Sequence, residues 1–152
     1  MRFFLVDRVD EIIPGESCRG VKGITLTEDY LHDHFPENPL FPGTLMVEAL
    51  AQLGGFLVES SCPAEPQPRA VLAQIDRAKF YQPVRPGDQL ELRCKLLSTL
   101  EGAAQVEGQA FVGSTRVARA TLTFVLRQVT SEKVHEQRRQ LYHLWTSHLA
   151  QP

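Results

Sequence analysis

Cysteine is scarce in this 152-residue chain, and its three cysteines lie far apart. Cys18, Cys62 and Cys94 form no C-x-x-C pair, so we expect neither a disulfide framework nor a zinc site. We predict reduced thiols that pack in the interior of a cytoplasmic protein. Long apolar runs are missing too, because no stretch approaches the roughly 18 residues of a membrane-spanning helix. Charge follows the N-terminus too closely for a secretory signal, so we expect no membrane association.

An excess of positive charge is also absent. The chain has 16 lysines and arginines against 18 acidic residues, a net charge of −2, which argues against a general nucleic-acid binder. The motifs G-x-G-x-x-G, P-loop and G-x-S-x-G are missing, which removes the commonest nucleotide-binding and hydrolase classes. Hydrophobic residues make up 43% of the chain, which is ordinary globular usage, and the length suits one folded domain.

The apolar pattern predicts strands on both sides of a single helix. We expect two strands before the helix, over residues 3–13 and 17–27. About four strands should follow it, over residues 69–75 leading into 80–84, and over residues 90–96, 106–112 and 118–126. Residues 43–60 instead carry apolar side chains at helical spacing with few charges, which is typical of a buried helix. Runs of strand around one helix indicate an α+β fold, in which a curved antiparallel sheet wraps around the helix.

The C-terminal residues are predicted to form a separate extension. Residues 130–149 carry an apolar stripe at helical spacing, so the chain divides into a main domain, 1–127, and a C-terminal helical extension, 128–152. Three histidines of this extension lack the i, i+4 spacing of helical metal ligands, and we expect them at the solvated surface. They are His135, His143 and His148.

His34 is the first candidate for chemistry. It stands in a loop that contains Pro36, Pro39 and Pro42, and each proline restricts the residue before it to extended conformations. A stiff loop can hold an imidazole in one orientation, as a general base requires. The alternative is a surface histidine that makes a hydrogen bond in a turn.

Glu48 is the second candidate, because it is a carboxyl group among apolar helix residues. Such a group is costly to bury unless it is paired, protonated or used, and apolar surroundings favour the protonated form that a general acid needs. The alternative is a glutamate that reaches solvent or pairs with an arginine at a subunit interface.

Gly43 is the third candidate, because it opens the predicted helix directly after Pro42. Free amides at a helix start and the helix dipole can polarise a carbonyl oxygen, although the glycine could merely permit the turn. A base, an acid and a carbonyl-binding amide suit proton abstraction next to a carbonyl with loss of a β-hydroxyl. His32 and His34 have no third ligand at suitable spacing, so we expect no metal and no cofactor.

The stretch from His34 to Gln52 resembles the signature of a known enzyme family. With x for any residue, it is His34-Phe35-Pro36-x-x-Pro39-x-x-Pro42-Gly43-x-Leu45-x-x-Glu48-Ala49-x-Ala51-Gln52. This pattern is similar to that of the FabZ-type 3-hydroxyacyl-acyl-carrier-protein dehydratases of the FabA/FabZ family. Residues 5–9 and 75–88 also resemble that family, and the match spans residues 4–126.

The resemblance implies a hotdog fold and a homodimer in which two sheets join into one, often as a trimer of dimers. It implies a site that takes His34 from one subunit and Glu48 from the other, across an acyl tunnel. His34 would remove a C2 proton, Glu48 would protonate the departing 3-hydroxyl, and the Gly43 amide would bind the thioester carbonyl. The resemblance also implies that the tunnel or the catalytic loop is supported by Phe35, Pro36, Pro42 and Gln52.

The implied substrate is a (3R)-hydroxyacyl chain on an acyl carrier protein, and the product is a trans-2-enoyl thioester of fatty-acid or related acyl-chain biosynthesis. Carrier proteins are acidic, so basic residues would dock them. The candidates are Arg77, Lys79 and Arg85. Glu48 stands where FabA-type enzymes, which also isomerise the double bond, have aspartate, and this favours plain dehydration.

The chain departs from the family at three places. Asp33 precedes His34 where the family usually has glycine, residues 63–69 differ from the family's gating segment, and the tail beyond residue 127 lies outside the family core. Two other functions therefore stay open: a hotdog acyl thioesterase, and a non-catalytic acyl-binding accessory subunit of a specialised lipid or polyketide pathway.

Overall fold

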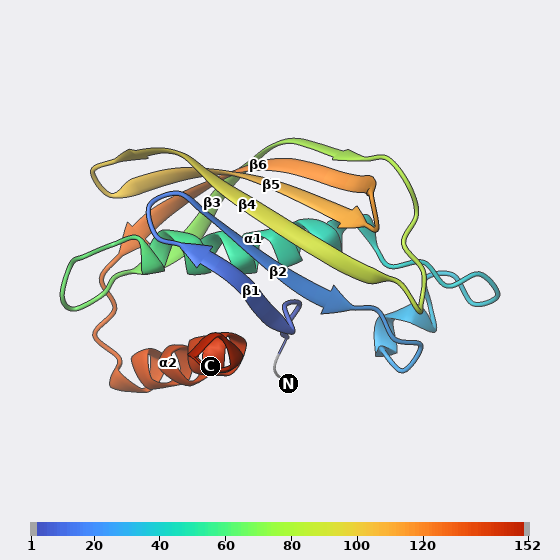
Figure 1. Ribbon diagram of the computed structural model, residues 1–152, viewed down its shortest axis with the longest axis horizontal. Helices are drawn as coiled ribbons and strands as arrows, with labels where there is room; N and C mark the ends of the chain where they lie inside the picture. Colours follow the sequence, from blue (N-terminus) through green and yellow to red (C-terminus); the bar gives the residue numbers. More distant parts are fainter. Residues whose placement is uncertain (1–2, 151–152) are drawn as a thin grey trace.

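The computed structural model describes residues 3–150, which form one antiparallel sheet and two α-helices (Figure 1). The strands are β1 (Arg8–Ile13), β2 (Ser17–Gly23), β3 (Arg69–Phe80), β4 (Gln89–Leu100), β5 (Ala103–Val112) and β6 (Thr115–Arg127). The helices are α1 (Gly43–Ser60) and α2 (Glu132–Thr146), with the short 3₁₀ helices η1 (Asp29–Leu31) and η2 (Ser147–Ala150). The predicted α+β class, central helix and C-terminal helix are confirmed.

The sheet has the strand order β1-β2-β4-β5-β6-β3, so β1 and β3 form its two edges. In β4, Leu90, Leu92 and Cys94 are buried, whereas Arg93 between them is exposed. This alternation gives the sheet one apolar face and one solvated face. Figure 1 shows the sheet arching over α1, which lies along the apolar face.

α1 begins directly after Pro42, whose carbonyl accepts hydrogen bonds from two amides of the first turn at 3.0 and 3.2 Å. The helix is held by burial of a row of leucines, since Leu50, Leu53 and Leu57 are each 0% exposed. Leu50 lies so close to β5 that a Cβ on Gly108 would be 3.1 Å from the Cβ of Leu50. The helix therefore packs almost onto the backbone of the sheet.

The structure corrects the bounds of the first two predicted strands. The first begins at Arg8 rather than at residue 3, because Phe3 and Leu5 form hydrogen bonds with the side chain of Gln52 instead of joining the sheet. The second strand ends at Gly23 rather than at residue 27.

The predicted stretch 69–75 leading into 80–84 ends earlier than expected. β3 is one strand that runs to Phe80, and residues 81–84 lie outside it. Its pairing with β6 shifts between Asp76 and Lys79, and Arg77 between them has a left-handed φ of 51°. This bulge interrupts the alternation from which strands are predicted.

Two of the cysteines pack in the interior, as predicted. Cys18 and Cys94 are partners across β2 and β4, and their thiols lie 3.6 and 3.5 Å from the carbonyl oxygens of Leu53 and Leu50. The hydrogen bond with Cys18, together with burial, raises the pKa of Cys94, so this thiol stays protonated. Cys62 is half-buried just after α1.

α2 lies beside α1 on the side away from the sheet (Figure 1). Its Tyr142 and Trp145 contact Phe56 of α1 edge-on, with ring centroids 4.8 and 5.9 Å apart. Such aromatic pairs add to the gain from burying their area. None of the helices within residues 3–150 is long and apolar enough to cross a membrane.

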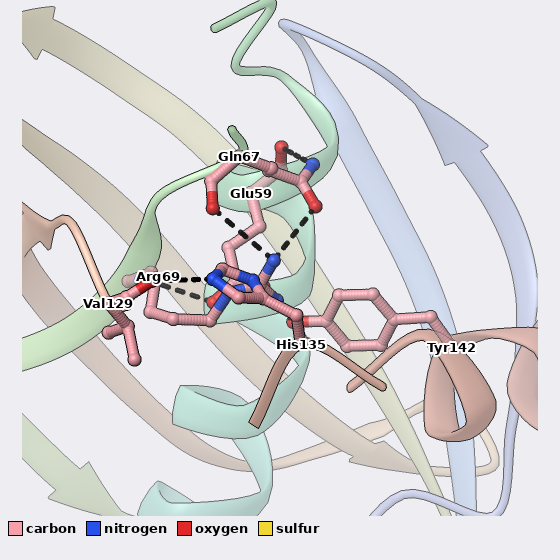
Figure 2. A network of polar contacts seen from close by, with 7 residues as sticks. Glu59, Gln67, Arg69, Val129, His135 and Tyr142 are labelled. Atoms are coloured by element: carbon pink, nitrogen blue, oxygen red, sulfur yellow. Dashed lines mark hydrogen bonds and ion pairs between the residues drawn. The ribbon is translucent and has the colours of Figure 1, made fainter. Parts of the chain in front are cut away.

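A buried polar network ties α2 to α1 and β3 (Figure 2). The Glu59 carboxylate is 1% exposed; it accepts hydrogen bonds from Arg69 Nη1 at 2.8 Å, the Tyr142 hydroxyl at 2.6 Å and the Ala70 amide at 2.8 Å. Burial and this carboxylate raise the pKa of Tyr142 well above its ordinary value. Glu59 thus joins three elements through charge-assisted hydrogen bonds.

The histidines of the extension differ from one another. His143 and His148 are exposed, as predicted. His135 is instead half-buried, with Nε2 2.6 Å from the Val129 carbonyl oxygen, so the prediction of a solvated side chain was wrong for it.

Candidate active site

His34 is fixed by hydrogen bonds on its backbone and its ring. Its carbonyl accepts from the Leu40 amide at 2.8 Å, and its Nδ1 lies 2.9 Å from the Leu40 carbonyl oxygen. A carbonyl oxygen can only accept, so Nδ1 carries the proton and donates it. In the neutral ring Nε2 then holds the free lone pair, which is the state of a general base.

The loop around His34 is closed by further contacts. The Phe35 ring stacks on the imidazole with centroids 4.5 Å apart, and the Phe35 carbonyl accepts from the Asn38 amide at 3.0 Å. The Asn38 side chain accepts a hydrogen bond from the guanidinium of Arg85. Pro36 is exposed within this turn, and Pro42 ends the loop at the start of α1.

Glu48 lies half-buried in α1 and is held by Gln52 one turn further on. The Gln52 Nε2 donates to the Glu48 carboxylate at 3.0 Å and to the Phe3 carbonyl at 3.1 Å, and its Oε1 accepts from the Leu5 amide at 2.9 Å. Because these backbone partners fix both ends of the amide, Gln52 presents a donor to Glu48. Within residues 3–150 the Glu48 carboxylate joins no ion pair.

Gly43 is the first residue of α1, so its amide has no carbonyl partner within the helix. The ring of Phe80, at the end of β3, lies over it. A Cβ on Gly43 would be 2.9 Å from Cδ1 of Phe80, so this position requires glycine if the ring is to stay in place. Sequence reasoning missed Phe80, and only the adjacent glycine could have suggested a close approach here.

The two candidate acid–base groups do not contact each other directly. No hydrogen bond joins His34 to Glu48 in the part of the chain that is described, and each is held by partners of its own. In the described range, no three histidine, cysteine or acidic side chains gather as a possible metal site.

The three predicted docking residues lie at the surface of the protein. Arg77 and Lys79 are exposed on edge strand β3, and Arg85 is exposed in the loop that follows it. Over residues 3–150 none of the three forms an ion pair. Their charges are therefore available to an acidic partner.

Comparison with known sequences shows clear relatives. The model of the FabA-like domain family matches residues 1–121. The chain is 43% identical over 122 residues to a 3-hydroxyacyl-(acyl-carrier-protein) dehydratase FabZ of Nitratidesulfovibrio vulgaris, covering 80% of this chain and 79% of the relative. A protein of the same name from Oleidesulfovibrio alaskensis is 42% identical with the same coverage.

Comparison with solved structures identifies the hotdog fold. The dehydratase heterocomplex ApeI:P of Xenorhabdus doucetiae has a TM-score of 0.67 at 14% identity, with 88% of each chain covered. A Streptococcus mutans protein bound to acetyl CoA also has a TM-score of 0.67, at 16% identity, covering 84% of this chain and 96% of that one. A thioesterase of Haemophilus influenzae reaches 0.62 at 10% identity, covering 80% and 79%. At such identities the likeness concerns the fold alone, because one fold hosts several activities.

Proposed function

The chain belongs to the FabA-like family, and from this membership we infer that it dehydrates 3-hydroxyacyl thioesters carried by an acyl carrier protein. One observation carries the proposal: the family match spans residues 1–121, which include His34 and Glu48, and the relatives at 42–43% identity are FabZ dehydratases. We assign the reaction to a cytoplasmic pathway of fatty-acid or related acyl-chain synthesis. The dehydratase domain is residues 1–127, and residues 128–152 extend it.

In the proposed reaction His34 is the general base. Its Nδ1–H donates to the Leu40 carbonyl, which leaves Nε2 to take the proton from C2 of the substrate. Electron density moves onto the thioester carbonyl oxygen, where the Gly43 amide at the start of α1 stabilises the negative charge.

Glu48 is the general acid. It gives its proton to the 3-hydroxyl, the C3–O bond breaks, and water leaves as the trans-2 double bond forms between C2 and C3. Gln52 holds the carboxyl through its 3.0 Å hydrogen bond. His34 ends the turnover protonated and Glu48 ionised, so proton exchange with solvent restores both.

A homodimer joined along β3 would complete the site. β3 is an edge strand, and it leaves Val71, Ile75 and Phe80 between 47 and 50% exposed. An apolar, unpaired edge favours pairing with another strand, here the β3 of a second copy. That pairing would bring the His34 loop of one subunit toward the Glu48 of its partner, and dimers could assemble further into a trimer of dimers.

The carrier protein would approach along Arg77, Lys79 and Arg85, which lie on and after the same strand. Acidic partners are steered by such exposed cations, and the steering weakens as salt is added.

The test is to incubate the protein with 3-hydroxyacyl and saturated acyl chains on carrier protein and to follow both products by mass spectrometry. We expect loss of water from the hydroxyacyl chain and no free carrier thiol. Thiol release without an enoyl product would identify a thioesterase instead. No turnover of either substrate would support the accessory acyl-binding subunit.

A further inference from the structure

A partly buried polar chain stands immediately before the loop that carries His34, with Lys22 buried and Glu28 and Tyr30 half-buried. The Lys22 side chain is 7% exposed, and its ammonium lies 2.5 Å from Oε1 of Glu28 and 2.7 Å from the Gly23 carbonyl oxygen. The other Glu28 oxygen accepts a hydrogen bond from the Tyr30 hydroxyl at 2.8 Å. Burial, and then the Glu28 carboxylate, raise the pKa of Tyr30, so the phenol keeps the proton that it donates.

Tyr30 closes the base of the loop. Its ring contacts Phe41 edge-on with centroids 5.7 Å apart, and the Phe41 amide donates to the Val84 carbonyl at 2.8 Å. Leu31 and Phe41, which flank residues 32–40, are each 2% exposed. Both ends of the loop are therefore anchored, and His34 is held between them.

The polar chain is poorly explained by stability alone. The Lys22 ammonium is buried and the Glu28 carboxylate is only 20% exposed, so bringing them together costs desolvation that their attraction often fails to offset. Apolar side chains at these positions would serve a merely structural purpose as well. A hydrogen-bonded network in a partly buried place does, however, favour one geometry. A general base needs such selection, because a misplacement of about 1 Å can cost on the order of a hundredfold in rate.

We propose that Lys22, Glu28 and Tyr30 are positioning residues that fix the His34 loop, and thereby the general base, for dehydration. The inference rests on the proposed function, because it gives His34 a catalytic role. Lys22 orients Glu28, Glu28 orients Tyr30, and Tyr30 holds the loop through Phe41.

A matched pair of variants tests the proposal. Tyr30→Phe and Tyr142→Phe each remove one hydroxyl group that donates a hydrogen bond to a carboxylate. The Tyr30 hydroxyl donates to Glu28 at 2.8 Å, and the Tyr142 hydroxyl, on α2, donates to Glu59 at 2.6 Å. Both variants should lower the melting temperature by a few degrees. With 3-hydroxybutyryl carrier protein, Tyr30→Phe should lower kcat about tenfold at little changed KM, whereas Tyr142→Phe should leave both unchanged.

A second readout does not need turnover. In protein labelled with ¹⁵N at histidine, the Nδ1–H signal of His34 is assigned by its loss in His34→Ala. We expect Tyr30→Phe and Lys22→Met to speed the exchange of this proton with water, Lys22→Arg to restore slow exchange, and Tyr142→Phe to have no effect. If the wild type fails to dehydrate any substrate, the proposed function falls while this experiment still tests the network. Unchanged exchange in folded Tyr30→Phe and Lys22→Met, or equal kcat in the two tyrosine variants, would overturn the inference.

Discussion

Removing Arg69 should destabilise the protein strongly, because it leaves a buried carboxylate without its cation. The Arg69 and Glu59 side chains are 7% and 1% exposed, and Nη1 of the arginine lies 2.8 Å from Oε2 of the glutamate. Breaking such a buried pair from one side costs about 3–5 kcal/mol. In Arg69→Met the Tyr142 hydroxyl and the Ala70 amide remain on Glu59, so we expect a loss near the lower end, about 3 kcal/mol.

Urea unfolding followed by circular dichroism measures this loss. The double variant Glu59→Gln/Arg69→Met removes both charges and keeps an amide oxygen that can accept from the Tyr142 hydroxyl or the Ala70 amide. It should recover more than about 1 kcal/mol relative to Arg69→Met, since no uncompensated charge remains. Arg93→Met is the control, because its ion pair with Glu91 is half exposed and should contribute at most about 1 kcal/mol. A loss in Arg69→Met no larger than in Arg93→Met would refute the reasoning, as would a double variant that is less stable than the single one.

Three further predictions concern the site and its surroundings. Gly43→Ala should displace the Phe80 ring and lower the free energy of unfolding in urea by about 1–3 kcal/mol. This loss should shrink when Phe80→Ala is added, because the new Cβ at residue 43 then has space. Gln52→Leu should lower kcat and should lower the free energy of unfolding by about 1–3 kcal/mol. The reason is that Glu48, the Leu5 amide and the Phe3 carbonyl lose their hydrogen-bond partner. An unchanged kcat would contradict the role of Gln52. The free energy of unfolding should fall as pH rises above about 10. There tyrosine ionises in the unfolded chain, whereas the raised pKa keeps Tyr142 protonated in the folded protein. Tyr142→Phe should flatten this decline.

The central helix could be predicted from the sequence because nothing interrupts its pattern. Apolar spacing runs unbroken from Gly43 to Ser60, and Pro42 marks its start. The end of β3 was placed at residue 84 rather than at Phe80, because the bulge at Arg77 breaks the period of two before the strand ends. The N-terminal strand was drawn too long because Phe3 and Leu5 have strand-like side chains, whereas their backbone groups bind Gln52.

The candidate catalytic residues were visible as anomalies of type and place: a histidine in a proline-rich loop and a glutamate in an apolar helix. The residues that support them were not. Lys22 and Glu28 resemble ordinary surface charges in the sequence, and Glu59 resembles a solvated residue near a helix end. Lys22 and Glu59 become buried, and Glu28 half-buried, only when distant segments fold together, and local periodicity does not report such packing.

Complementation between two inactive variants tests most directly whether His34 and Glu48 act as one pair. We expect His34→Ala and Glu48→Gln each to lose about 10²-fold or more of the dehydratase activity, the scale of general acid–base groups. Co-expressed with different affinity tags, equal amounts of the two chains should recover about a quarter of the wild-type sites, because half of the dimers are mixed and each has one intact site. Purified mixed dimers without activity would contradict the shared site, and full activity in either single variant would contradict the chemistry itself.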